Sequence, residues 1–370
     1  MAFQPFYYGG NTDADTSEAA RLRWRLSQQE TGEAISFVLR QEPGNCTLPE
    51  LESRFGPSLA EDVQKAGVLR TAGDALYLDC PVFLEEDMPC LCHLTSQAAE
   101  DIAALLTRCR PRMDRILSPL HNGFPPEVNL YHLLCGHIFD GLYFDYLETE
   151  GLVSTGRDLP SGFSDLVILY EGAPSLESWV RSLLCSYNRW GSREGVFQSF
   201  GDCGGRRRDF YQAYAGQRED RSPPPLPREE LVRAFIALTD GREAEPAAIA
   251  AFTLFGYARE GRPCVPVYRW DTDQPVWEEL FQLVLSATAG PVGEVLSQIG
   301  SCSSLTANRH GVPVRDTANE VYHLLFGQVN EALVRLGVTA PPEEYGPEGR
   351  YLKSFEIFPA GTGGQTNTKE

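Results

Sequence analysis

The most restrictive feature of this 370-residue sequence is an internal repeat. Residues 131–137 read Tyr-His-Leu-Leu-Cys-Gly-His, and residues 322–328 read Tyr-His-Leu-Leu-Phe-Gly-Gln. Two further pairs of similar segments keep the same order along the chain: 81–83 with 266–268, and 166–170 with 353–358. Because three landmarks recur in one order, the sequence predicts two diverged copies of a single unit.

The repeat divides the chain into five parts. The length also favours two domains, since it is about twice that of a typical domain. The predicted parts are an N-terminal segment (1–29), a first copy (30–172), a connector that ends in a Pro-rich linker (173–227), a second, degenerate copy (228–359) and a disordered tail (360–370). The predicted fold class is α+β, with each copy a helix-rich unit.

The start of the first copy, residues 33–84, has the pattern of three short helices followed by a β-ribbon. Thr47, with Glu50 three residues later, predicts the capped start of the second helix, and Ser58 the start of the third. Residues 75–78 and 82–84 are predicted to form the ribbon. This order resembles that of winged-helix modules. The second copy lacks a clear third helix before its own ribbon at 257–267.

The rest of each copy is predicted to be a helical pair and a closing strand, at 94–172 in the first copy. The pairs are 98–109 with 131–147, and 276–288 with 319–336, and the strands are 166–170 and 353–358. The repeated motif places Tyr131, His132 and Gly136 in one copy, and Tyr322, His323 and Gly327 in the other. We expect the glycines to allow close packing, and both histidines to be buried with their hydrogen bonds made.

The charge distribution argues against nucleic acid as the general partner. The net charge is −19, made up of −14 in residues 1–175, +3 in residues 176–228 and −8 in residues 229–370. The predicted third helix of the winged-helix-like part carries Glu61 and Asp62 against Lys65. Such a surface opposes binding to a phosphate backbone, so DNA is possible as a partner but disfavoured.

The net-basic connector is the best candidate for binding an anion or a nucleic acid. Guanidinium groups and aromatic rings alternate there, a combination suited to phosphates and stacked bases. The candidate residues are Arg189, Arg193, Arg206, Arg207, Arg208, Trp190 and Tyr211. The alternative is that these arginines pair with carboxylates of the acidic copies. We favour this internal pairing, because the copies are tethered to the connector.

Metal and catalytic sites are weakly indicated. Cysteines and histidines lie close together at Cys80, Cys90, Cys92 and His93, and again at His132, Cys135 and His137. Their spacing is not that of common zinc sites, and the second copy has Phe and Gln where the first has Cys135 and His137. Common nucleophile, phosphate-loop and metalloprotease motifs are missing. The sequence therefore predicts no metal, no cofactor and no assigned catalytic residue.

The leading functional hypothesis is a non-enzymatic regulatory or protein-interaction protein. The alternatives are a transcription-related DNA-binding regulator and an enzyme with a site between the two copies. The expected partner is another protein or a small anionic ligand, not a membrane, since the uninterrupted apolar runs are far shorter than a bilayer span. The scattered cysteines and the N-terminal residues, which do not resemble a signal peptide, favour a cytoplasmic location.

Overall fold

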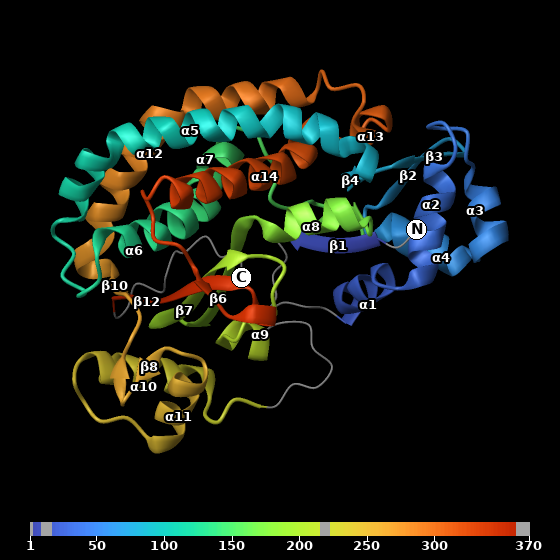
Figure 1. Cartoon of the computed structure of the whole chain (residues 1–370). Coiled ribbons are helices and arrows are strands. Elements are labelled where there is room, and N and C mark those ends of the chain that lie inside the picture. The colour runs from blue at the N-terminus through green and yellow to red at the C-terminus, as the bar shows by residue number, and fades with distance from the viewer. Residues whose placement is uncertain (1–2, 9–16, 215–222, 360–370) are drawn as a thin grey trace.

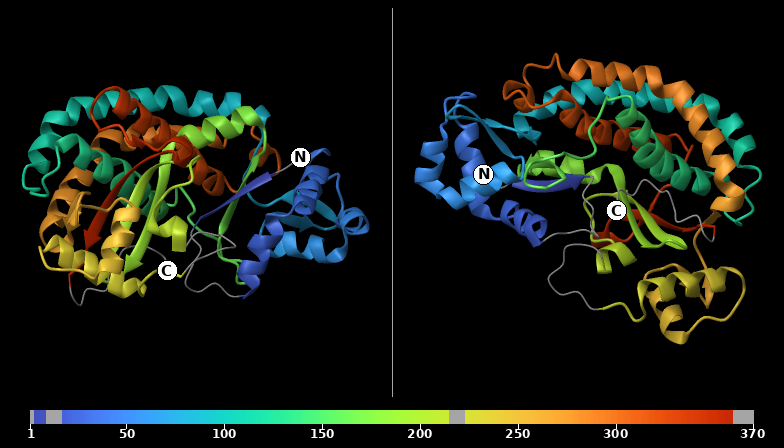
Figure 2. Two further views of the ribbon diagram at one scale, coloured as in Figure 1. Left: turned by 60° about the horizontal axis from the view of Figure 1, so that its bottom comes forward. Right: turned by 180° about the vertical axis from the view of Figure 1, so that it is seen from behind.

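The computed structural model describes residues 3–8, 17–214 and 223–359 (Figure 1). The predicted tail at 360–370 lies outside the described residues. The protein is a mixture of helices and sheets, as predicted. The N-terminal domain and a small helical unit lie at opposite ends of a layered body, as Figure 2 shows from two further directions.

The N-terminal domain contains four short helices and a β-hairpin packed around a core of its own. Its elements are α1 (Ser17–Leu26), α2 (Gln29–Leu39), α3 (Leu48–Phe55), α4 (Pro57–Lys65), β2 (Leu69–Ala72) and β3 (Ala75–Leu78). The predicted cap of α3 is confirmed, since Thr47 and Glu50 form a capping box. Helix α4 begins at Pro57 after Gly56, one residue before the predicted start at Ser58.

The predicted pairing of the ribbon at 75–84 is wrong. Strand β3 pairs with β2, because Gly73 at φ 63° closes a tight turn between them. Strand β4 (Val82–Phe83) instead runs parallel to β5 (Leu166–Glu171), whose other edge pairs with β1 (Phe3–Tyr8). The Pro81 carbonyl accepts a hydrogen bond from Leu169 N at 3.0 Å. Residues 82–83 therefore pair with β5 and not with β3.

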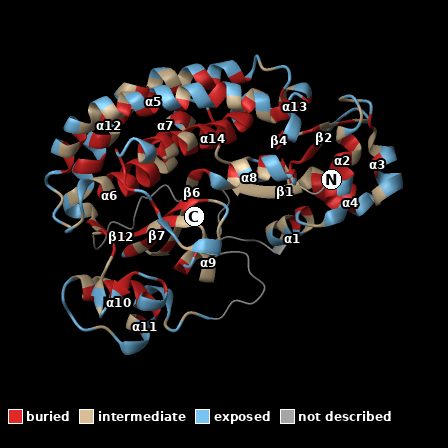
Figure 3. Cartoon of the chain, viewed as in Figure 1, coloured by how far each residue is buried: buried red, intermediate tan, exposed pale blue. Residues whose placement is uncertain are grey.

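The body is a stack of long helices. Helices α5 (Met88–Leu117) and α12 (Trp270–Ile299) lie side by side on the outside. Beneath them lie α14 (Val314–Arg335), α6 (Pro126–Leu130), the π-helix η2 (Tyr131–Leu142) and α7 (Tyr143–Thr149). Figure 3 shows α14 almost entirely buried, whereas α5 and α12 expose their outer faces. Both outer helices have 30 residues and are longer than predicted, because prolines at 111, 275 and 291 are accommodated within them.

One helix, α12, is long and apolar enough to span a membrane when judged by length and composition. Its most apolar 18-residue window has a mean hydropathy of 1.2, and 39% of that window is buried inside the protein. Val276, Leu280 and Leu283 place its apolar face in the main core, where α12 contacts α5 and α14. A single such helix that belongs to a folded core is weak evidence for a membrane span.

A second sheet lies under η2 and α14. Its strands are β6 (Leu184–Ser192), β7 (Gly195–Asp202), β10 (Val267–Arg269), β11 (Glu343–Glu344) and β12 (Arg350–Ile357), and β12 lies between β10 and β7. No strands were predicted for residues 184–202, yet these residues form the hairpin at one edge of the sheet. Much of the predicted connector is therefore an integral part of the body.

A small helical unit packs on the other face of this sheet. It contains α10 (Arg228–Thr239), α11 (Pro246–Leu254), β8 (Ala258–Arg259) and β9 (Arg262–Pro263). Its core includes Phe235 and Phe252, which contact Phe197 and Phe355 of the sheet. Apart from 3₁₀ turns, the remaining described elements are three short helices: α8 (Pro174–Ser182), α9 (Phe210–Tyr214) and α13 (Thr306–Arg309).

The two glycines of the repeated motif lie at close contacts between helix and sheet. A Cβ at Gly136 would lie 3.4 Å from the ring of Phe200, and one at Gly327 would lie 3.0 Å from Leu183 Cβ. Both helices thus lie close to the β6–β7 hairpin, and an added Cβ would crowd its neighbour at Gly327 more than at Gly136, where the contact is close to an ordinary van der Waals distance.

Candidate ligand-binding site

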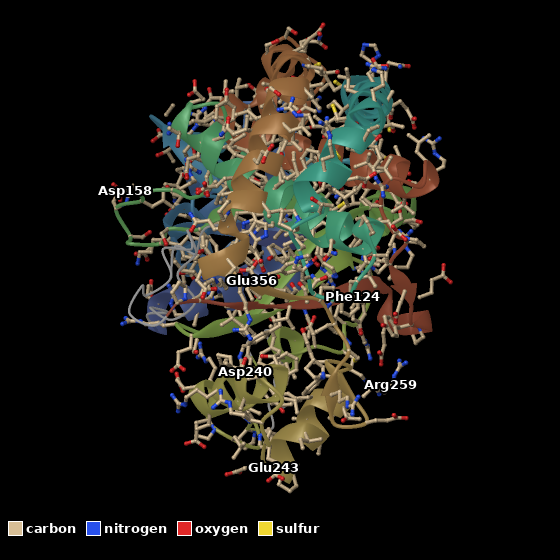
Figure 4. The ribbon with its side chains drawn as sticks, turned by 90° about the vertical axis from the view of Figure 1, so that its left-hand side faces the viewer. Phe124, Asp158, Asp240, Glu243, Arg259 and Glu356 are labelled. Carbon is tan, nitrogen blue, oxygen red and sulfur yellow. The ribbon has the colours of Figure 1, made fainter. Side chains whose placement is uncertain are left out.

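A pocket of about 400 Å³ opens where the small helical unit meets the sheet and η2. We call it the Lys353 pocket. Its walls come from Gly256 and Arg259 of the small unit, Tyr351 and Lys353 of β12, Tyr345 and Glu348 of the preceding loop, and Phe124 and His132 of the body. In Figure 4, Phe124 and Arg259 lie on the same side of the molecule, above and below this junction.

The pocket is centred on a buried amine. Lys353 is only 7% exposed, and its Nζ lies 5.0–5.7 Å from the ring centroids of Tyr351, Tyr345 and Tyr257. Among the described residues its ammonium makes no hydrogen bond and no ion pair. Tyrosine faces attract a cation but do not replace the hydrogen bonds that an ammonium forms in water. Burial therefore lowers the pKa of Lys353 to about 8, although Asp209, Glu343 and Glu348 act in the opposite direction.

Arginines surround the outer part of the Lys353 pocket. Arg208 and Arg259 line it, and an adjoining hollow of about 650 Å³ shares Arg208 and Glu348 and adds Arg206 and Arg207. The carboxylates that line the two cavities are Asp209, Glu343 and Glu348. Five cationic side chains thus face three anionic ones in a chain whose net charge is −19. This local excess of positive charge suits an anionic ligand.

His132 brings an unpaired imidazole to the Lys353 pocket. It is 6% exposed, and its Nε2 has no hydrogen-bond partner among the described residues. Burial lowers the pKa of His132 to about 3, so its ring is neutral at pH 7. It lies on η2, and π-helical turns often occur at functional sites.

A buried acid lies on the opposite face of β12, toward η2. Glu356 is 1% exposed, and its carboxylate lies 3.4 Å from His137 Nδ1, 3.4 Å from Arg189 Nη2 and 3.3 Å from Trp270 Nε1. Burial opposes its ionisation, but His137, Arg189 and Gln198 outweigh this effect and lower the pKa of Glu356 to about 2. The charged carboxylate thus fastens β12 to the hairpin, to η2 and to the start of α12.

The predicted connector residues do not gather into one site. Arg189 pairs with Glu356, Trp190 stacks on Phe210 in the core of the small unit, and Arg193 is exposed at the hairpin turn. Tyr211 is half-buried on α9. The remaining three, Arg206, Arg207 and Arg208, all line the 650 Å³ hollow.

These three arginines differ in how they are paired. Arg207 is buried and donates hydrogen bonds to the backbone carbonyls of Ser199 and Asp202 at 2.9 and 2.7 Å. Arg208 is half-exposed, 3.6 Å from Glu348, and the exposed Arg206 makes no side-chain hydrogen bond or ion pair among the described residues. In the part of the chain that the structure describes, only Arg208 of the three lies near a carboxylate of the predicted second copy, whereas Arg207 is bound to backbone carbonyls within the connector and Arg206 and Arg208 still face solvent.

The two tyrosines of the repeated sequence motif make different contacts, Tyr131 with strand β7 and Tyr322 with η2. The Tyr131 hydroxyl donates to the Phe200 carbonyl at 3.3 Å, and the Tyr322 hydroxyl donates to the Phe139 carbonyl at 3.0 Å. His323 is buried with Nδ1 3.0 Å from the Asn319 carbonyl. The expectation of a buried, hydrogen-bonded histidine therefore describes His323. It does not describe His132, which faces the Lys353 pocket.

The cysteines and histidines considered for a metal are dispersed. Cys80 is buried between β3 and β4, Cys90 lies beside Cys302, and Cys135 is buried in the main core. Among the described residues no group of three or more His, Cys, Asp or Glu is placed to hold a metal ion.

Gly256 offers a test of how closely the Lys353 pocket is fitted around its amine. A Cβ at Gly256 would lie 3.0 Å from Lys353 Nζ, whereas a Cβ at Gly261 would meet nothing within 4 Å. Both glycines have positive φ, 70° and 71°, so Ala at either should cost about 1 kcal/mol of stability. We expect only Gly256→Ala to displace the amine and weaken ligand binding, by about tenfold. Equal binding by both variants in calorimetric titration would contradict this arrangement.

Comparison of the chain with models of protein families, with curated protein sequences and with solved structures finds no match. The proposals below therefore depend on the geometry and chemistry of the chain itself.

Several residues of the Lys353 pocket were missed in the sequence analysis, notably Lys353, Tyr257, Tyr345 and Tyr351. One signal was present. Only three of the 32 basic residues are lysines, at positions 65, 353 and 369. Lys353 is the first residue of the predicted closing strand, with Tyr351, Leu352 and Phe355 close to it in sequence. Lysine can lose its proton when it is buried, whereas arginine keeps its charge, so a rare lysine in such a strand is a signal that could have been followed.

Proposed function

We propose that this protein is a regulatory protein that binds a small anionic ligand in the Lys353 pocket. The observation that carries the proposal is Lys353, a residue only 7% exposed whose ammonium lies at the wall of an open cavity and makes no hydrogen bond or ion pair among the described residues. A buried, unpaired charge lowers the stability of a fold, and a bound anion would offset that cost. Arg208 and Arg259 at the outer part of the pocket support the same sign of ligand.

The size and lining of the pocket favour a small ligand with a ring. A volume of about 400 Å³ lies at the lower end of the range for small-molecule sites. Tyr345, Tyr351 and Phe124 offer aromatic surface, and Lys353 and Arg208 offer charge for a phosphate or a carboxylate. Binding there would bridge the small helical unit, the sheet and η2, so the ligand could change how these parts hold together.

Calorimetric titration with phenyl phosphate tests the proposal. We expect binding that weakens as salt is raised, and a loss of at least tenfold in affinity in Lys353→Met. Lys65→Met is the matched control, because Lys65 is exposed on α4 and pairs with Glu61. Phenyl phosphate, benzoate and inorganic phosphate all failing to bind the wild-type protein, or binding Lys353→Met equally well, would rule out the proposed site.

We further propose that the two halves are diverged copies of one unit, as the sequence repeat indicates. In the first half β4 pairs in parallel with β5, with Val82 opposite Leu169. In the second half β10 pairs in parallel with β12, with Val267 opposite Phe355. A 30-residue helix follows the short strand in each half. The proposed winged-helix likeness of residues 33–84 is supported by the order α2, α3, α4, β2, β3 and by a bridge between Thr47 and Ala75.

For this winged-helix-like part we propose a role in protein contacts, with DNA binding as the less favoured alternative. Helix α1 packs against α4, and Arg21 and Arg25 of α1 bind Asp62 of α4 at 2.7–3.0 Å. Glu61 is exposed on what remains of the α4 surface. A helix so covered and so charged is poorly suited to the major groove.

DNA binding through this part is therefore expected to be undetectable at physiological salt. Fluorescence polarisation with a pool of random duplexes would check this. Submicromolar binding that is lost in Lys65→Ala and retained in Lys353→Met would instead favour the DNA-binding alternative.

A further inference from the structure

We propose that Lys353 captures aldehyde-bearing anions by forming an imine between its Nζ and the carbonyl carbon of the ligand. This inference rests on the proposed anion-binding function and assigns the ligand class: a small aromatic or planar aldehyde that carries a phosphate or a carboxylate.

The Lys353 amine lies among aromatic rings and has no ion-pair partner among the described residues. Nζ lies 5.0–5.7 Å from the ring centroids of Tyr257, Tyr345 and Tyr351 at the wall of the pocket, and no carboxylate among the described residues pairs with it. An ion pair would hold the amine in its protonated, unreactive form. The lysine on α4, Lys65, is held in that way, since Nζ lies 2.8 Å from Glu61.

The pocket beside the Lys353 amine has room for a small ligand and is lined by arginines. The pocket of about 400 Å³ touches Lys353, and Arg208 and Arg259 line the same cavity. Arg206 and Arg208 line the adjoining hollow. A planar ligand could therefore place its carbonyl at Lys353 while its anionic group meets a guanidinium. Guanidinium groups bind phosphate and carboxylate but cannot form imines under these conditions. The arginines would therefore bind the anionic group, and Lys353 would form the imine.

The Lys353 amine is partly neutral, and therefore reactive, at pH 7. Only the neutral amine attacks a carbonyl. With a pKa of about 8 for Lys353, about one-tenth of the protein carries the neutral amine at pH 7. For Lys65, whose pKa is raised by Glu61 above the ordinary 10.5, the neutral fraction is below about one-thousandth. Burial in apolar surroundings is a known way to activate a lysine toward carbonyl groups.

The chemical step is balanced without any oxidant or reductant. The lone pair of Nζ forms a bond to the carbonyl carbon, and the π electron pair moves to the oxygen, which takes up a proton. The carbon–oxygen bond of this adduct then breaks. The oxygen takes up a second proton and leaves as water, and the nitrogen, which began with two hydrogens, releases both as protons. The net change is an aldehyde and a primary amine giving an imine and one water molecule.

The test uses the full-length protein with pyridoxal 5′-phosphate as an aromatic aldehyde phosphate and pyridoxine 5′-phosphate as the matched alcohol. Reduction with sodium borohydride fixes any imine as a stable secondary amine. Because the chain has three lysines, peptide mass spectrometry assigns the modified position directly. At pH 7 and limiting aldehyde we expect modification at Lys353 to exceed modification at Lys65 by at least 50-fold. We also expect none at position 353 in Lys353→Arg, which keeps the charge.

The possible results separate this inference from the proposed function. Binding of pyridoxine 5′-phosphate together with no preference for Lys353 in the trapped product would overturn imine formation and leave the anion site standing. Absence of binding by either compound would overturn both. Protection of Lys353 from the aldehyde by added pyridoxine 5′-phosphate, with Lys65 labelling unchanged, would support both.

Discussion

Replacing Lys353 by Met is expected to raise the free energy of unfolding at pH 7 by about 3 kcal/mol. Met has a similar length and carries no charge, so it removes the cost of burying an ammonium without opening a large cavity. The size follows from the fall of the Lys353 pKa from its ordinary 10.5 to about 8. If Lys353 is present for ligand binding and not for stability, Lys353→Met should be more stable than the wild type and should bind the ligand less well.

The pH dependence of this gain has a definite sign. Below pH 8 Lys353 is protonated in both states, so the folded wild-type protein bears the whole cost of the buried charge. Between pH 8 and 10.5 the unfolded chain keeps a proton that the folded protein has released, and wild-type stability rises with pH. The advantage of Lys353→Met should therefore shrink across this window and vanish above it.

Urea unfolding from pH 6 to 10.5 measures this difference. Lys65→Met is the control, because the Lys65 side chain forms a surface ion pair with Glu61 and its replacement should change stability little across this pH range. A constant difference between Lys353→Met and the wild type over the whole range would mean that the folded-state pKa of Lys353 is not lowered.

The second large effect is expected from Glu356→Gln, which should lower the free energy of unfolding at pH 7 by about 3 kcal/mol. The variant keeps the shape of the side chain but removes the negative charge that faces Arg189 and His137. Arg189 would then be buried beside a neutral amide. Because Glu356 connects β12 with β6, η2 and α12, the loss should appear in global unfolding.

Acid unfolding gives an independent check on Glu356. Its pKa is lowered from 4.5 to about 2, so its contribution to stability is complete above pH 4.5 and is lost as the pH falls toward 2. Glu356→Gln should lack this loss, so the two proteins should converge in stability near pH 2. Glu279→Gln, at an exposed position on α12, serves as the control. Equal acid sensitivity of Glu356→Gln and the wild type would contradict the charged state of Glu356.

The local sequence was sufficient for elements whose signals lie within a few residues. Thr47 and Glu50 predict the start of α3 because both halves of a capping box are contained in one helical turn. The closing strand at 166–170 was predicted correctly because its continuous apolar run is typical of a strand covered on both faces. The mixed α+β class follows from such local patterns.

The pairing of strands was decided by tertiary structure. Residues 82–83 were predicted to join 75–78 in a ribbon, yet they pair with a strand more than 80 residues later in the chain. The hairpin at 184–202 alternates aromatic, charged and small residues because one face meets η2 and the other meets the small unit. No residue near it in sequence carries that information.

For the candidate site, too, the sequence determined some features and the tertiary structure decided the others. The sequence determined that Lys353 is one of three lysines and lies in a strand, and that the only net-basic stretch surrounds Arg206, Arg207 and Arg208. Only the fold brings Arg208 and Lys353 to one cavity and leaves His132 unpaired beside them. The physical reason is that burial and the loss of hydrogen-bond partners depend on every chain segment packed around a group, and these segments are hundreds of residues apart in sequence.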